Sequence, residues 1–160
     1  MFNNLAGTLM VEVIALANDL TVRSITLSGS TSGDFISIGY DSDSNSVTAS
    51  LYNGAYQAMF TTAIYNITKN LKIAFAYKLN EFKLYINGLQ VGTTDTSGTL
   101  ADGLDTLSFN SVSGTEDFYG SVRQLKYFDS ALTDSELEEL TYFDGDLDGA
   151  LLQNELQNPI

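Results

Sequence analysis

The stretch FKLYINGLQVGT, residues 82–93, contains the clearest fold signal in the chain. Apolar residues occupy every second position from Phe82 to Ile86, so one face of a strand there is apolar. Asn87-Gly88 then predicts a two-residue type I′ turn, because both central positions of this turn need positive φ, which Asn tolerates and Gly adopts freely. The stretch therefore predicts a β-hairpin.

Working outward from this hairpin, short apolar or alternating runs recur about every ten residues as far as residue 128. Segments rich in Gly, Ser, Asp and Asn separate them, at 28–34 and 41–46, and suit turns. This spacing is typical of an all-β fold, and we predict an antiparallel β-sandwich of two sheets. The runs are 8–13, 25–27, 36–38, 47–51, 71–78, 82–92, 106–111 and 118–128.

The end of the patterned region predicts one bulge and one helix. Alternation in 118–128 breaks once, which places a β-bulge near Arg123-Gln124. Thr133 and Glu136 have capping-box spacing, and Leu132 with Leu137 has the spacing of a hydrophobic staple, so a short helix should begin there and run to about Phe143. We expect residues 1–143 to form the sandwich domain with this helix, and 144–160 an acidic C-terminal segment.

Composition excludes several function classes. The chain has no cysteine and therefore no disulfide, and it has no histidine, which removes His general bases, Ser/Cys-His pairs and His-ligated zinc. With 20 acidic against 7 basic residues and a net charge of −13, it should repel nucleic acids and anionic bilayers. The apolar N-terminal run lacks a basic region before it, so we expect neither a signal peptide nor a transmembrane segment.

Two parts of the sequence resemble laminin G-like, concanavalin A-like lectin and glucanase jelly rolls. EFKLYINGLQVGT (81–93) and FYGSVRQLKYFDSALTDSELEEL (118–140) are similar to the C-terminal half of such domains. GTLMVEVIAL (7–16) and ISIGYDSDSNSVTASLYN (36–53) are similar to the first half of versions found in bacteriophage tail, fibre and virion-surface proteins. The resemblance covers roughly residues 5–141 and implies two stacked sheets that often bind carbohydrate. The matching positions in its last part are Phe118, Gly120, Val122, Leu125, Tyr127, Ala131, Leu132 and Glu136.

The family also contains glucanases, so a hydrolytic function needs consideration. Retaining glycosidases place two carboxyl groups about 5–5.5 Å apart, which on one strand requires residues two or four positions apart. The Glu-x-Asp-x-Glu strand pattern of glucanases is missing from this sequence. The acidic pairs that exist lie in predicted turns, and we therefore expect no enzymatic activity. These pairs are Asp41/Asp43, Asp102/Asp105 and Glu116/Asp117.

The acidic tail contains one metal-binding pattern, DGDLDGALLQNE at 144–155. Calcium loops of the EF-hand type place oxygen ligands at positions 1, 3, 5, 7, 9 and 12, with Gly at position 6. The residues that fit are Asp144, Asp146, Asp148, Ala150 through its carbonyl, and Glu155. Position 9 is Leu152, which supplies no side-chain ligand, and an acidic segment without bound metal is the alternative. If Ca²⁺ binds, it should raise the melting temperature, and Asp144→Ala should abolish that rise.

Aromatic residues near loops are the candidate ligand contacts. Sugars stack on exposed rings, and in a chain without Trp the tyrosines must serve, with Asn side chains bonding to hydroxyl groups. The candidates are Tyr40, Asn45, Tyr52, Asn53 and Tyr56. For each of them, packing in the core or on a sheet is the competing interpretation. A neutral glycan suits the acidic surface better than a sulfated or phosphorylated one, unless bound Ca²⁺ bridges the charges.

Three functions follow from these observations, in order of preference. The first is a non-catalytic carbohydrate-binding or adhesion module on a phage virion or another extracellular surface. The second is a structural decoration or fibre subunit that acts through contacts with other virion proteins. A glycoside hydrolase ranks last. The sequence leaves homo-oligomerisation open.

Overall fold

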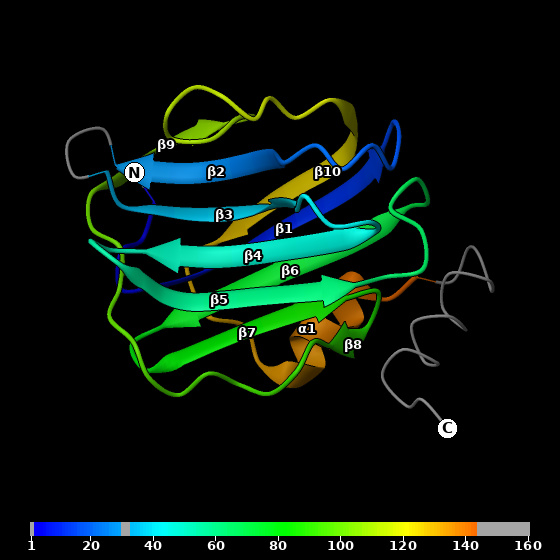
Figure 1. Cartoon of the computed structure of the whole chain (residues 1–160). Coiled ribbons are helices and arrows are strands. Elements are labelled where there is room, and N and C mark those ends of the chain that lie inside the picture. Colours follow the sequence, from blue (N-terminus) through cyan, green and yellow to red (C-terminus); the bar gives the residue numbers. More distant parts are fainter. Residues whose placement is uncertain (1, 30–32, 144–160) are drawn as a thin grey trace.

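The computed structural model describes residues 2–29 and 33–143 and shows two five-stranded antiparallel sheets packed face to face (Figure 1). Sheet A consists, in spatial order, of β10 (Gly120–Phe128), β1 (Ala6–Ala15), β6 (Leu71–Lys78), β7 (Glu81–Ile86) and β8 (Leu89–Gln90). Sheet B consists of β5 (Tyr56–Ala63), β4 (Ser46–Tyr52), β3 (Phe35–Tyr40), β2 (Arg23–Gly29) and β9 (Leu104–Ser108). The predicted all-β sandwich is confirmed.

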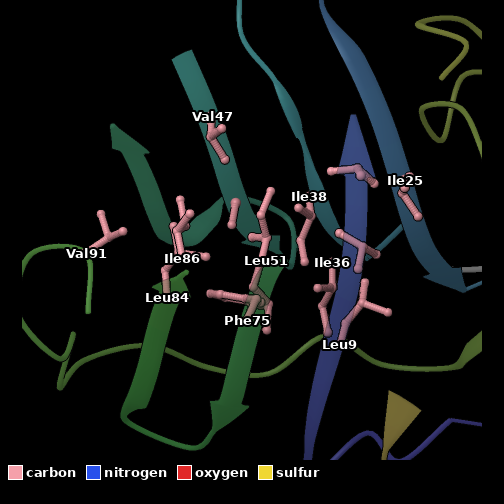
Figure 2. Packing of buried hydrophobic residues seen from close by; sticks show 14 of the residues in the cluster. Leu9, Ile25, Ile36, Ile38, Val47, Leu51, Phe75, Leu84, Ile86 and Val91 are labelled. Atoms are coloured by element: carbon pink, nitrogen blue, oxygen red, sulfur yellow. The ribbon is translucent and has the colours of Figure 1, made fainter. Parts of the chain in front are cut away.

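The core lies between the sheets and is formed by every second residue of the central strands. Figure 2 shows Ile25, Ile38 and Leu51 of sheet B meeting Leu9 and Phe75 of sheet A. These side chains are fully or almost fully buried. Because side chains alternate across a strand, the intervening residues form the two outer faces.

The hairpin and the bulge lie where the sequence predicts them. Asn87 and Gly88 have φ values of 48° and 84° between β7 and β8, as a type I′ turn requires. Glu12 pairs with Gln124 and Val13 with Val122, so Arg123 is the extra residue of a bulge in β10.

Helix α1 (Asp134–Thr141) packs on the outer face of sheet A. Thr133 is the N-cap, and both bonds of the capping box to Glu136 are present. Leu137 is fully buried, and Leu132 and Leu140 pack against the same cluster. The predicted start is confirmed, and the helix ends at Thr141, two residues before the expected end.

One strand is absent from the sequence-based prediction, namely β5. Its residues pair with β4, from Ser46 opposite Ala63 to Tyr52 opposite Tyr56, and it forms one edge of sheet B. The sequence YQAMFTTA lacks a clean alternation because Met59 and Phe60 are adjacent, yet Phe60 points into the core against Phe75. No helix in the described part of the chain is long and apolar enough to cross a membrane.

Candidate functional site

The outer face of sheet B contains a depression of about 500 Å³, a volume within the range of small-molecule sites. This face is turned toward the viewer in Figure 1. Strands β2 to β5 form its floor and one wall, and the 109–119 connection between β9 and β10 forms the other wall. We call this depression the sheet B pocket.

Small hydroxyl side chains form the floor of the sheet B pocket. They occupy the positions between the core residues of β2, β3 and β4, and the strand register brings them into rows. One row joins Thr26, Ser37 and Ser50, and the next joins Ser24 and Thr48 on either side of Gly39. A Cβ at Gly39 would collide with the Arg23 backbone, so no side chain fits between them. The floor is therefore open and rich in hydrogen-bonding groups.

Thr26 differs from the other floor residues. Its side chain is 1% exposed, and its Oγ1 has no hydrogen-bond partner among the described residues. Buried hydroxyl groups are normally paired, because an unpaired one loses its bonds to water without replacement. Thr26 lines the pocket, but its hydroxyl oxygen is itself shielded from solvent, so a bound molecule would reach this hydroxyl only after the side chain rotates toward the pocket.

An aromatic cluster formed by Phe35, Tyr52 and Tyr56 stands at one end of the floor. Phe35 and Tyr52 stack with ring centroids 5.1 Å apart and planes 7° apart, and Tyr56 meets both rings edge-on. Tyr56 is 56% exposed, and it lines the pocket together with Phe35. The neighbouring rings fix the Tyr56 ring in place, so stacking of a ligand on it would cost little side-chain entropy of Tyr56.

The opposite end of the pocket is acidic. Glu116, in the left-handed region with φ of 58°, accepts a bond on Oε2 from Ser24 Oγ at 3.1 Å. The Glu116 carbonyl also accepts a bond from the Ser24 backbone N–H at 3.0 Å, which ties the 109–119 connection to β2. Asp41 lines the pocket as well, whereas the described residues of the lining include no Lys or Arg.

Three of the predicted ligand residues lie in or beside the sheet B pocket. Tyr56 lines the sheet B pocket, and Tyr52 supports it through the aromatic cluster while its hydroxyl bonds to the Gly54 carbonyl at 3.1 Å. Asn53 lies beside them, but its Nδ2 donates to the Leu100 carbonyl at 2.7 Å and so holds the 91–103 connection between β8 and β9.

Tyr40 and Asn45 do not lie in the pocket. Tyr40 is 1% exposed and stacks on Phe118 at 5.6 Å, and burial raises the pKa of its phenol far above the ordinary value. A ring in this position has no free face for a sugar, so the expectation for Tyr40 does not fit the structure. Asn45 is a turn residue with φ of 52°, and its Oδ1 accepts a bond from the Ile67 backbone N–H at 3.1 Å.

The calcium prediction for Asp144, Asp146, Asp148, Ala150 and Glu155 concerns residues outside those that the structure describes, and it stays a prediction. Within residues 2–29 and 33–143, no group of three or more His, Cys, Asp or Glu side chains could hold a metal ion.

Sequence reasoning missed the hydroxyl floor and the 109–119 wall. A signal for the floor was present, because Ser and Thr take the outward positions in SITLS (24–28), ISI (36–38) and SVTASL (46–51), where a solvated sheet face would ordinarily carry longer charged residues. The wall had no such signal, since it is made by contacts between positions far apart in the sequence, such as Ser24 and Glu116.

Comparison with known proteins identifies relatives of this architecture. Residues 8–138 match a family model described as the Concanavalin A-like lectin/glucanases superfamily. No curated protein sequence matches the chain significantly.

Several solved structures share the fold at low sequence identity. The CBM40 module of the Ruminococcus gnavus IT-sialidase, bound to alpha2,3 sialyllactose, has a TM-score of 0.67 at 16% identity, over 87% of this chain and 84% of that one. Domain 4 of the Geobacillus stearothermophilus arabinanase AbnA, in complex with arabinotriose, has a TM-score of 0.57 at 15% identity, over 88% and 68%. Domains LG4-5 of the mouse laminin alpha1 chain have a TM-score of 0.53 at 17% identity, over 91% and 41%.

Proposed function

This chain belongs to the concanavalin A-like lectin/glucanases superfamily, and from that membership we propose that it is a non-catalytic carbohydrate-binding module. The sheet B pocket is the proposed binding site. One observation carries the proposal: the fixed, half-exposed ring of Tyr56 stands beside a floor of hydroxyl groups that includes the unpaired Thr26. An aromatic platform next to convergent hydrogen-bonding groups matches the two faces of a sugar ring, one made of C–H groups and one of hydroxyls.

The charge of the pocket supports a neutral glycan. Asp41 and Glu116 line it, its described residues include no Lys or Arg, and the whole chain has a net charge of −13. A sialylated or sulfated sugar would bring an anion to this site and meet repulsion from both carboxylates. We therefore expect a preference for neutral over sialylated glycans, unlike that of the sialyllactose-bound CBM40 module, although the folds are similar.

The proposal of a non-catalytic module follows from the position of the acidic groups. Strands β2, β3 and β4 contain no Asp or Glu, so no carboxylate projects from the pocket floor itself. Asp41 follows the end of β3, and Glu116 lies in a loop where it bonds to Ser24. A glycosidase needs two carboxyl groups on opposite sides of a scissile bond, held by rigid elements.

A finer proposal is that the module acts on a virion or another extracellular surface. It is supported by the resemblance of residues 7–16 and 36–53 to bacteriophage tail and fibre domains. Mass spectrometry should detect the chain in purified virions or in the culture medium of the producing cells. Its absence from both would contradict this location.

The binding proposal is tested with a glycan array followed by titration calorimetry on the best ligand. We expect neutral glycans to bind and Tyr56→Ala to weaken binding about tenfold or more, which corresponds to about 1.4 kcal/mol. Tyr65→Ala is the matched control, because both rings are 56% exposed and Tyr65 lies outside the pocket.

Two results would contradict the proposal. Equal loss in the Tyr56 and Tyr65 variants would remove the sheet B pocket as the site. No glycan binding at all would favour the structural subunit, and sugar release from a polysaccharide would favour the hydrolase.

A further inference from the structure

The sandwich has four edge strands, and three of them carry features that discourage pairing with another chain. Charged side chains, very short strands and bulges at sheet edges block such pairing. β10 carries Arg123, Lys126 and a bulge, β8 has two residues, and β9 carries Asp105 and an irregular register with β2. β5 has eight residues and contains neither a charged residue nor a proline, and its register with β4 is irregular only at its start, at Gln57, so Ala58–Ala63 form a regular edge. In Figure 1 it forms the lower margin of the nearer sheet.

The backbone of β5 presents unpaired groups at this edge. The Ile64 N–H donates to the Asn45 carbonyl at 2.8 Å. In an antiparallel ladder the backbone N–H and C=O groups of every second residue, here Ala58, Phe60 and Thr62, therefore also point toward β4. The alternate residues Met59, Thr61 and Ala63 direct their N–H and C=O groups away from β4. Among the described residues, the outward backbone groups of Met59 and Thr61 have no partner.

The charge distribution shows what can approach this edge. Residues 44–68 contain no Asp, Glu, Lys or Arg, although the chain has a net charge of −13. Two copies repel each other wherever their acidic surfaces meet, and this neutral segment is where that repulsion is weakest. Tyr56 and Met59 add exposed apolar surface, at 56% and 55%. The edge therefore suits a second copy of this chain better than a charged partner.

We propose that β5 pairs antiparallel with β5 of a second copy, so that the two B sheets join into one continuous sheet. A strand that pairs with itself in this way forms an isologous contact about a twofold axis. Centred on Thr61, the pairing sets Thr61 opposite Thr61 of the second copy and Met59 opposite Ala63 of the second copy. The outward backbone N–H and C=O groups of Met59, Thr61 and Ala63 then gain partners in the second copy.

The pairing has a consequence for binding. The twofold axis of a continuous antiparallel sheet is normal to that sheet, so both outer faces lie on the same side. Because Tyr56 and Met59 of β5 line the sheet B pocket, the two pockets then open side by side. The dimer would bind a repetitive glycan at two sites and gain avidity. This consequence rests on the proposed function, whereas the pairing does not.

The pairing is tested by sedimentation equilibrium without any glycan, across roughly a hundredfold range of protein concentration. We expect a reversible dimer for the wild-type chain and a monomer for Thr61→Lys, which places a charge at the centre of the contact. Thr106→Lys is the matched control, an exposed threonine on the outer face at the opposite edge of the same sheet, and it should dimerise like the wild type. A monomeric wild type, or equal dimerisation of both variants, would overturn the proposal.

A second measurement applies even if Thr61→Lys folds poorly. The chain has no cysteine, so Thr61→Cys introduces a single thiol. Cα atoms of residues directly opposite in an antiparallel pair lie about 5.5 Å apart, within the range for a disulfide. Mild oxidation should give covalent dimers with Thr61→Cys and not with Thr106→Cys. Equal cross-linking of Thr61→Cys and Thr106→Cys would contradict the pairing. A wild-type chain that dimerises but binds no glycan would contradict only the proposed function.

Discussion

The outer faces of the two sheets differ, although their inner faces are both apolar. On sheet A the outer face carries Met10, Ala74, Ala76 and Tyr85, and helix α1 covers it. On sheet B the outer face carries small hydroxyl side chains and three aromatic rings, and the sheet B pocket lies open on it. An apolar outer face needs a cover to remove it from water, whereas a hydroxyl-lined face stays stable while exposed. The outer face of sheet A therefore contributes to stability, whereas the outer face of sheet B is free to carry the proposed binding site.

The largest expected effect comes from breaking the covered face. Leu137 is fully buried between α1 and sheet A, so Leu137→Ala should lower the free energy of unfolding by about 2–4 kcal/mol through lost burial and a cavity. Urea denaturation measures this loss, and glycan affinity of the folded protein should not change. Glu139→Ala, at an exposed position of the same helix, is the control and should change stability by less than about 0.5 kcal/mol. Equal losses would show that α1 does not cover sheet A.

Much of the difference between the two outer faces could be predicted from the sequence. The capping box at Thr133 predicted the helix, and the apolar run at 71–78 with the alternation in 82–86 predicted the neighbouring strands, because these signals are local. The position of Tyr40 could also have been inferred, since it has the same parity as Ile36 and Ile38 and must point into the core with them. Its place at the end of a strand suggested a loop residue, and parity is the stronger signal.

Other features could not be read from local pattern. β5 has a weak alternation and becomes a strand because β4 offers it a partner. The acidic end of the pocket depends on Glu116 reaching Ser24 across the fold. Such contacts depend on how loops pack after the sheets have formed, and the sequence pattern of either segment does not contain that information.

A smaller effect concerns the polar attachment of α1 to the same face. Lys83 contacts Asp134 at 2.9 Å and Glu81 at 3.2 Å. The hydrogen bond from Lys83 holds the pKa of Asp134 below 3.8, and bonds from Lys78 and then Lys83 hold the pKa of Glu81 below 4.5. Carboxyl groups with lowered pKa values stabilise the folded state at neutral pH, and this stabilisation is lost as the pH falls through the lowered values.

Lys83→Met should therefore reduce the acid sensitivity of unfolding below about pH 4.5 and cost less than about 1 kcal/mol at pH 7, because the ion pairs are partly solvated. Urea denaturation at several pH values measures both. Lys126→Met is the control, since Lys126 is exposed and forms no ion pair with a described residue. If both variants keep the wild-type acid dependence, the Lys83 contacts do not contribute to it.

The smallest expected change in stability, and the sharpest test of the open face, comes from Thr26→Val. Removing a buried hydroxyl that has no partner eliminates a desolvation cost, so stability should stay constant or rise by up to about 1 kcal/mol. Thr48→Val is the comparison within the same pocket, because Thr48 Oγ1 donates to the Phe60 carbonyl at 3.2 Å and its loss should lower stability by about 1 kcal/mol.

Affinity should separate from stability in Thr26→Val. If the Thr26 hydroxyl bonds to the ligand, calorimetry should show glycan binding weakened about fivefold to tenfold in a protein that is at least as stable as the wild type. A purely structural threonine would change stability and affinity together, or neither. Unchanged affinity would therefore remove Thr26 from the site, and a stability loss larger than that of Thr48→Val would show that its hydroxyl is paired in the folded chain. A buried polar group left without a partner on an exposed face is retained at a cost to folding, and a bound glycan would compensate for that cost.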